Sequence, residues 1–165
     1  MLSEIEACIP ALRRYARALL RSRQDADDLV HECLVRALDK LHTRRDGGDM
    51  RAWLFAIMHN VFISQRRQSR RQAAKPEQQP TADIRIEAGQ ETAVLFRDVV
   101  REFYKLSEEQ RQAMLLVSVE DLSYAEAARV MGVPIGTVMS RLSRGRQRLR
   151  QVSQGEPRPS LRRVK

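Results

Sequence analysis

Apolar residues recur every three or four positions along almost the whole chain, which is the period of an α-helix that buries one face. In the first half this pattern predicts three helices, at about 4–21, 25–41 and 50–71. Three aspartates in the first turn of the second helix favour a start there, because carboxylates stabilise the positive end of the helix dipole. No convincing segment alternates with the period of two that a strand requires. We therefore expect an all-α fold.

The helical pattern breaks in the middle of the chain. Residues 74–90 hold two prolines, many polar side chains and no apolar period, and we interpret them as a flexible linker. The sequence therefore predicts two small helical domains, at 1–73 and 91–152, followed by a basic tail at 153–165.

The second half predicts four helices, at about 91–104, 108–119, 124–131 and 134–152. Two of them begin with a capping box, in which a serine and a Gln or Glu three residues later each satisfy a free backbone N–H. These pairs are Ser107 with Gln110 and Ser123 with Glu126.

Segment 123–144 combines a short helix, a turn at Gly132 and a second helix that begins near Pro134. Glycine suits the left-handed backbone of such a turn, and proline suits a helix start, where its missing N–H is not needed. Small Ala127 and Ala128 let the two helices cross closely. This arrangement is typical of a helix-turn-helix, whose second helix enters the DNA major groove. An ordinary helical hairpin with a basic surface is the alternative.

The second helix of this motif has two distinct sides at about 100° per residue. One stripe is expected to face the core: Val138, Leu142, Gly145 and Leu149. The opposite side holds small polar residues and an arginine that can reach base edges: Gly136, Thr137, Ser140, Ser143, Arg144 and Gln147. The flanks carry arginines suited to phosphates: Arg141, Arg146 and Arg148.

The chain carries a net charge of +9, divided as +5 over 1–73, −1 over 74–90 and +5 over 91–165. A charge of this size favours a polyanionic partner, either nucleic acid or an acidic membrane. No apolar run is long enough to span a membrane, and the first residues have neither the basic nor the apolar region of a secretory signal. Together with only two cysteines, this predicts a cytoplasmic protein with free thiols.

Three segments together resemble the extracytoplasmic-function (ECF) sigma factors of bacteria. Residues 26–37 resemble the second conserved region of that family, 53–60 the region that follows it, and 132–146 its C-terminal recognition helix. They occur in the family's order and nearly at its spacing, and the resemblance covers about 5–152. It implies a sigma-2-like domain that opens and reads the −10 promoter element and a sigma-4-like domain that reads the −35 element. It also implies core RNA polymerase, promoter DNA and an anti-sigma factor as partners.

The resemblance assigns the outer face of the helix at 25–41 to the clamp helices of the largest polymerase subunit. The assigned residues are Asp28, His31, Glu32, Val35, Arg36 and Asp39. A mixed-charge face suits a protein partner better than DNA, because carboxylates repel phosphates. On the residues alone, a solvated helix with pairs such as Glu32–Arg36 and Arg36–Lys40 is the alternative.

The −10 element is assigned to the end of the third helix, through His59, Asn60, Ser64, Arg66 and Arg67. Amide and hydroxyl groups can hold an extruded base, and arginines can hold the single-stranded backbone. A buried, hydrogen-bonded position is the alternative for the asparagine. The neighbouring aromatic residues lie among apolar residues, so we expect them in the core rather than stacked on bases: Trp53, Phe55 and Phe62.

The −35 element is assigned to the recognition helix, through Gly136, Thr137, Met139, Ser140, Arg141, Ser143, Arg144 and Arg148. Met139 departs from the family, which commonly has a cation at this position. Methionine can contact a thymine methyl group but cannot donate a hydrogen bond to guanine, so we expect a −35 preference that differs from the commonest one.

Two other functions compete with a sigma factor. One is a stand-alone helix-turn-helix regulator that binds operators as a dimer. The other is a sigma mimic that titrates an anti-sigma partner, although a mimic would not need the basic residues. His31, Cys33 and His59 lack the spacing of a zinc site, and no motif for phosphate binding or nucleophilic catalysis occurs. We therefore expect no metal, no cofactor, no small-molecule substrate and no catalysis by this chain.

Overall fold

Helices form the regular secondary structure of the computed structural model, which describes residues 1–44, 48–72 and 90–154. The N-terminal half (residues 1–72) contains α1 (Leu2–Leu19), α2 (Arg23–Lys40), the 3₁₀ turn η1 (Leu41–Thr43) and α3 (Met50–Gln72). The C-terminal half (residues 90–154) contains α4 (Gln90–Lys105), α5 (Glu108–Met114), the π-helical turn η2 (Leu115–Val119), α6 (Tyr124–Met131) and α7 (Ile135–Ser153). The expected all-α fold is confirmed.

The predicted helices match these bounds to within two residues, except that 108–119 divides into α5 and the π-helical turn. The linker predicted at 74–90 and the tail predicted at 153–165 lie almost entirely outside the described residues. The exceptions are Gln90, where α4 begins, and Ser153 and Gln154 at the end of α7. Within the described ranges, none of the helices is both long enough and apolar enough to cross a membrane.

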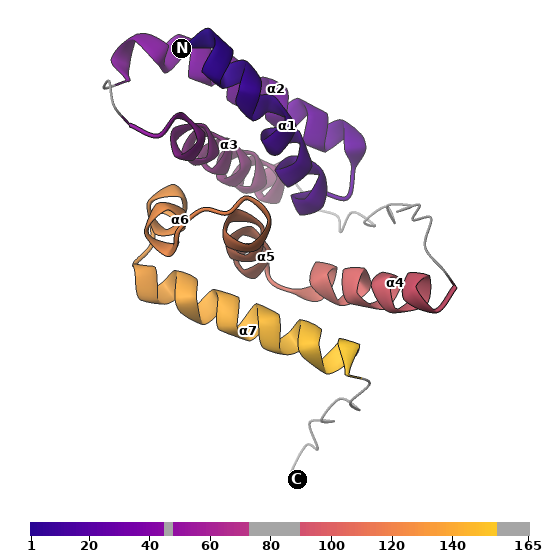
Figure 1. Cartoon of the computed structure of the whole chain (residues 1–165). Coiled ribbons are helices and arrows are strands. Elements are labelled where there is room, and N and C mark those ends of the chain that lie inside the picture. Colours follow the sequence, from indigo (N-terminus) through magenta and orange to yellow (C-terminus); the bar gives the residue numbers. More distant parts are fainter. Residues whose placement is uncertain (45–47, 73–89, 155–165) are drawn as a thin grey trace.

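The N-terminal half is built around α2, which packs against both α1 and α3 (Figure 1). The apolar stripes of the three helices meet in a buried core that includes Leu12, Tyr15, Leu29, Leu54, Phe55, Met58 and Phe62. The rings of Tyr15 and Phe55 meet edge to face, with centroids 5.2 Å apart. Leu38 shares the apolar period of the buried residues of α2, which by itself predicts a core position, but the structure contradicts this, because the residue is 51% exposed.

The helix-turn-helix of the C-terminal half forms as expected. Gly132 ends α6 with φ +63°, and Pro134 takes the N-cap position just before α7 begins. Both predicted capping boxes are present, at the starts of α5 and α6. At Gly145 a Cβ atom would lie 2.6 Å from Sδ of Met114, so the glycine lets α7 approach α5 closely. The core stripe of α7 is buried at Val138 and Leu142.

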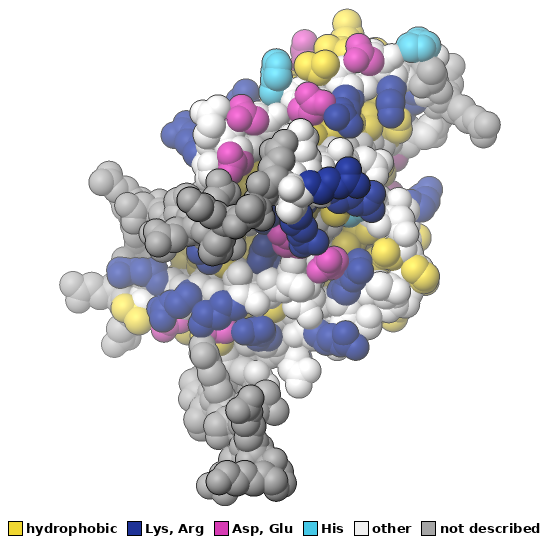
Figure 2. All heavy atoms as spheres, turned by 180° about the vertical axis from the view of Figure 1, so that it is seen from behind, with side chains coloured by type: hydrophobic (Ala, Val, Ile, Leu, Met, Phe, Trp, Pro, Cys, Tyr) yellow, Lys and Arg dark blue, Asp and Glu magenta, His cyan; other side chains and the backbone are white. Residues whose placement is uncertain are grey.

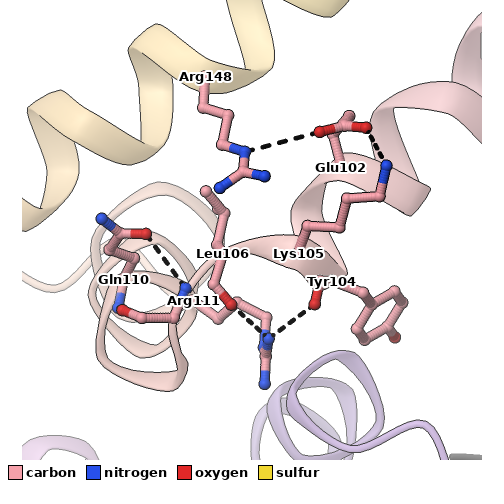
Figure 3. A network of polar contacts seen from close by, with 8 residues as sticks. Glu102, Tyr104, Lys105, Leu106, Gln110, Arg111 and Arg148 are labelled. Carbon is pink, nitrogen blue, oxygen red and sulfur yellow. Dashed lines mark hydrogen bonds and ion pairs between the residues drawn. The ribbon is translucent and has the colours of Figure 1, made fainter. Parts of the chain in front are cut away.

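The corner between α4 and α5 is held by Arg111 (Figure 3). Its Nη1 donates hydrogen bonds to the carbonyl oxygens of Tyr104 at 3.1 Å and Leu106 at 2.7 Å. These carbonyls end α4 and have no further turn of helix to bond them, so the guanidinium satisfies them. The direction of α4 relative to α5 is therefore set by a side chain as well as by packing.

The two halves pack against each other (Figure 1). α3 lies against α6, and α1 lies against η2 and α5. Buried apolar residues from both halves form one continuous cluster. We call the contact of α1 and α3 with α5, η2 and α6 the interdomain interface.

Candidate polymerase-binding and DNA-binding surfaces

The outer face of α2 is accessible along its length. Asp28, His31 and Asp39 are exposed, and Glu32 and Arg36 are half-buried. Nε of Arg36 donates to Oε1 of Glu32 at 2.6 Å, which is one of the pairs expected for a solvated helix. All six residues assigned to polymerase contact therefore lie on one open surface.

This outer face also carries apolar surface. Val35 is 41% exposed, and Leu38 lies one turn away at 51% exposed. Apolar side chains do not stabilise a helix face that contacts only water, whereas a protein interface combines apolar contact with a charged rim. Leu38 is the residue that the sequence reasoning missed, because its position in the helical period resembles that of the core residues.

The residues assigned to the −10 element divide between two stripes of α3. Asn60, Ser64 and Arg67 are exposed, which excludes the alternative that Asn60 is a buried, hydrogen-bonded residue. His59 and Arg66 instead turn toward the C-terminal half, where Arg66 forms an ion pair with Glu108 of α5. The structure thus leaves three of the five residues open to a ligand and places two in the interdomain interface.

His59 lies against Gln112 of α5, which is 1% exposed. Burial lowers the pKa of His59 below its usual value, Gln112 opposes this shift, and the charge of Arg141 adds to the lowering. The ring is therefore held in its neutral form at neutral pH. Neither Nδ1 of His59 nor the side-chain amide of Gln112 has a hydrogen-bond partner among the described residues.

The aromatic residues near the −10 stripe behave as core residues. Phe55 and Phe62 are 1% and 2% exposed, which confirms that they are not free to stack on bases. Trp53 is half-buried and packs against the same core. The guanidinium of Arg66 lies 5.6 Å from the centroid of the Phe62 ring, so the ring supports a cation of the interdomain interface.

The first turns of α7 present the residues assigned to the −35 element. Most of that set is exposed on one side of the helix: Gly136, Met139, Ser140, Ser143 and Arg144. Thr137 is half-buried, and its carbonyl oxygen accepts a hydrogen bond from Oγ of Ser140 at 3.0 Å. Arg144 makes no ion pair with a residue in the part of the chain that the structure describes.

The other two arginines assigned to the −35 element are partly engaged. Arg141 is half-buried near His59 and Glu109. Nε of Arg148 lies 3.6 Å from Oε2 of Glu102, a carboxylate that also pairs with Lys105 (Figure 3). Figure 2 shows Lys and Arg side chains on both halves of the face that is turned away in Figure 1.

Glu120 is the most notable residue that sequence reasoning did not find. Its side chain is fully buried, and both of its ion-pair partners belong to the N-terminal half. Arg14 of α1 donates twice, from Nε to Oε1 at 2.9 Å and from Nη2 to Oε2 at 2.6 Å. Arg51 of α3 donates from Nη2 to Oε2 at 2.7 Å. The available signal was a pair of adjacent carboxylates, Glu120 and Asp121, directly after a largely apolar run at 113–119.

Two family models match the chain. Residues 5–59 match the family described as the Sigma2 domain of PhyR, and residues 96–149 match the family described as Sigma-70, region 4. The ECF RNA polymerase sigma factor EcfG of Rhodopseudomonas palustris is 35% identical over 146 residues, covering 88% of this chain and 81% of that protein. This chain belongs to the ECF sigma factors.

Other relatives agree with this assignment. The ECF RNA polymerase sigma factor SigM of Mycobacterium tuberculosis is 33% identical over 140 residues, which cover 84% of this sigma factor and 69% of SigM. The structure is also similar to the sigma factor RpoE of Bartonella quintana, crystallised with the anti-sigma factor NepR. That similarity has a TM-score of 0.78 at 32% identity, covering 94% of this chain and 97% of RpoE. The helix-turn-helix of α6 and α7 lies within region 4 of this sigma factor.

Proposed function

We propose that this sigma factor recognises its promoter at two separate surfaces. The outer face of α2 binds core RNA polymerase, the exposed stripe of Asn60, Ser64 and Arg67 on α3 contacts the opened −10 element, and the first turns of α7 read the −35 element. The observation that carries this proposal is the exposure of all three surfaces on helices whose opposite faces are buried. As a partner of RNA polymerase, the protein acts in the cytoplasm.

The proposal includes control by an anti-sigma factor. The support is the similarity to RpoE, which was crystallised with the anti-sigma factor NepR. It also accounts for the interdomain interface, where His59 is half-buried and Arg66 is held by an ion pair with Glu108 in the free chain. For these two residues to reach the −10 element, the halves must separate.

Reconstitution tests the proposal. The purified chain is mixed with core RNA polymerase and fragmented genomic DNA of its own source, and the transcripts are sequenced. We expect new transcripts whose start sites share two upstream elements. Binding of duplex DNA without polymerase and without new transcripts would instead support the stand-alone regulator.

Variants then test the individual surfaces. Arg144→Ala is expected to weaken binding to promoters with an intact −35 element, while Asn60→Ala is expected to slow promoter opening more than initial binding. Arg97→Ala is a matched control, because this arginine is exposed on α4, a helix that carries none of the assigned residues. Unchanged transcription by both test variants would contradict the residue assignments.

The sigma mimic remains as a second candidate because of one observation. The N-terminal family model is described as the Sigma2 domain of PhyR rather than that of a transcribing sigma factor. A mimic would bind an anti-sigma factor but direct no transcription, so the same reconstitution separates the two functions. The exposed arginines of α3 and α7 support the sigma factor.

A further inference from the structure

The recognition helix exposes two large apolar side chains in its first two turns. Ile135 is 49% exposed and Met139, one turn later, is 50% exposed. Residues four apart lie on the same face of a helix, so the two side chains form one small apolar surface. Hydrophobic side chains reach the surface at the edge of the molecule where α6 and the beginning of α7 lie (Figure 2).

Internal packing does not account for this apolar surface. The core of the C-terminal half is filled from the other side of α7, through Val138 and Leu142, which are 0% and 2% exposed. Between the two exposed residues lies Gly136, whose missing side chain lets a ligand approach the backbone closely. Arg144 follows on the exposed side of the helix.

The chemistry of this surface fits a particular set of base edges. In the major groove the C5-methyl group of thymine is the apolar feature, whereas guanine offers two acceptors that suit a bidentate arginine. Isoleucine and methionine donate no hydrogen bond from their side chains, so they discriminate by contact with methyl groups. Arginines at the flanks of α7 provide the positive charge that phosphates require.

We infer that Ile135 and Met139 select thymine methyl groups in the −35 element, next to a guanine bound by Arg144. This inference rests on the proposed −35 role of α7. It predicts that the selected −35 element contains adjacent thymines. A contacted methyl group contributes about as much as one buried CH₂, so its loss weakens binding about fourfold.

The experiment uses the complete holoenzyme and promoter DNA with a randomised −35 region. After selection of the preferred sequence, each thymine is replaced by deoxyuridine, which removes only the methyl group. We expect about fourfold weaker binding at one or two positions for the native protein and no such loss for Met139→Ala at the position it contacts. Val94→Ala is the control, since this side chain is 55% exposed on α4.

The outcomes distinguish the contact with thymine methyl groups from the −35 role of α7. If deoxyuridine changes nothing while Arg144→Ala still weakens binding, the methyl inference is wrong and the −35 role stands. If selection yields no −35 sequence and Arg144→Ala has no effect, the −35 role itself is wrong. Loss of binding at a thymine that is equal in native protein and Met139→Ala would assign that methyl group to another residue and overturn the inference for Met139.

A second inference follows independently from Glu120. A fully buried carboxylate is unfavourable unless its charge is paired, and here both ion-pair partners among the described residues, Arg14 and Arg51, come from the other half of the molecule. The hydrogen bond and charge of Glu120 raise the pKa of Arg14. When the halves are together the carboxylate is paired, and when they separate it becomes hydrated. Its burial therefore depends on the closed arrangement.

Beside its apolar contacts, the interdomain interface also buries polar side chains that are incompletely satisfied. Buried side-chain atoms without a hydrogen-bond partner among the described residues are Nε of Arg51, Nδ1 of His59, Nε of Arg66, Nε of Arg111 and both amide atoms of Gln112. These atoms lie on α3 and α5, which are joined by the ion pair of Arg66 with Glu108. Unpaired buried polar atoms lower the stability of the closed arrangement. The Glu120 pairs therefore add a charge-dependent contribution to the apolar contacts that join the two halves.

We propose that Glu120 acts as an electrostatic latch that keeps the free sigma factor closed and limits its access to DNA. Neutralising the carboxylate removes the buried charge of this contact, so that Arg14 and Arg51, which are themselves partly exposed, lose the partner that holds them across the interdomain interface. The closed population should then fall at least about tenfold relative to the open one. The open form exposes His59 and Arg66, so promoter binding by the isolated chain should rise.

Small-angle scattering of the full chain tests the latch. Glu120→Gln is expected to increase the radius of gyration and to strengthen binding of a promoter duplex in the absence of polymerase. Asp98→Asn is the matched control, because Asp98 pairs with Arg101 on the exposed surface of α4. Circular dichroism confirms that each variant keeps its helices.

Arg14→Gln provides a second variant on the opposite half. The Arg14 side chain is 53% exposed, so its replacement does not disturb the core of the N-terminal half. Opening by both variants supports the latch. An unchanged radius of gyration and unchanged DNA binding in both would overturn it, and if Glu120→Gln unfolds, the result with Arg14→Gln decides.

Discussion

The core of the N-terminal half and the interdomain interface are both buried, but they are built from different side chains. The core joins Leu12, Tyr15, Leu54 and Phe55, which have no charge to satisfy. The interdomain interface joins its apolar residues with charged and polar ones, since it also buries Glu120 and Gln112 beside arginines and a histidine. Exposing apolar side chains to water is unfavourable, so an apolar contact resists separation. Polar groups that separate can instead form hydrogen bonds with water, so their contact opens at a lower cost. We therefore expect the core of the N-terminal half to stay packed under conditions in which the interdomain interface opens.

The largest effect is expected from breaking the apolar core. Leu54 is 0% exposed between α3 and its neighbours, and Leu54→Ala leaves a cavity there. We expect a loss of about 2–5 kcal/mol in the free energy of unfolding. Chemical denaturation followed by circular dichroism measures it. A loss below about 1 kcal/mol would show that the core relaxes around the cavity and is less closely packed than the structure indicates.

A smaller effect is expected within the C-terminal half. Gly145→Ala places a methyl group 2.6 Å from Sδ of Met114, so α5 and α7 must move apart or the methionine must change its rotamer. We expect a loss of about 1–3 kcal/mol from this overpacking. Thermal denaturation of the full chain measures it. Combining the variant with Met114→Ala should recover part of the loss, and no recovery would assign the strain to another contact.

Salt is expected to distinguish the two buried regions. The ion pair of Arg66 with Glu108 and those of Glu120 contribute to the interdomain interface, while the core has no charged member. Raising the ionic strength from about 0.05 M to about 0.5 M should increase the radius of gyration, with little change in helix content. Arg66→Gln should open the chain by a smaller amount than Arg14→Gln, because Glu108, the partner of Arg66, is 22% exposed and partly hydrated, whereas Glu120, the partner of Arg14, is fully buried. Equal opening by the two variants would contradict this order.

The smallest effect is expected from pH. Burial lowers the pKa of His59 in the closed form, and separation returns the ring to water and its ordinary pKa. Below that ordinary value the open form binds more protons, so the closed form loses stability as pH falls from about 7.5 to about 5.5. Scattering at the two pH values measures the shift. His59→Gln should remove it, because His31 and His42 are exposed on the N-terminal half; persistence of the shift would exclude His59 as its source.

Much of the candidate site follows from helical period alone. The exposed positions of Met139, Ser140 and Arg144 are the side of α7 opposite to its core stripe, and the exposed position of Asn60 follows in the same way from α3. Leu38 shows the limit of this reasoning, because α2 is buried over a narrower stripe than its apolar residues suggest. The partial burial of His59 and the ion pair of Arg66 could not be predicted, since both depend on a second half that packs on α3.

The sequence by itself determined the local features of this protein: the helices, both capping boxes, the left-handed turn at Gly132 and the apolar stripe of α7. Each depends on residues within a few positions of one another, where backbone hydrogen bonding and side-chain period act directly. Only the tertiary structure decided that Glu120 meets Arg14, 106 positions away, and Arg51, 69 positions away. Such pairs form only after the two halves have packed against each other. The periodicity of apolar residues within each helix does not show which surfaces of the two halves will meet.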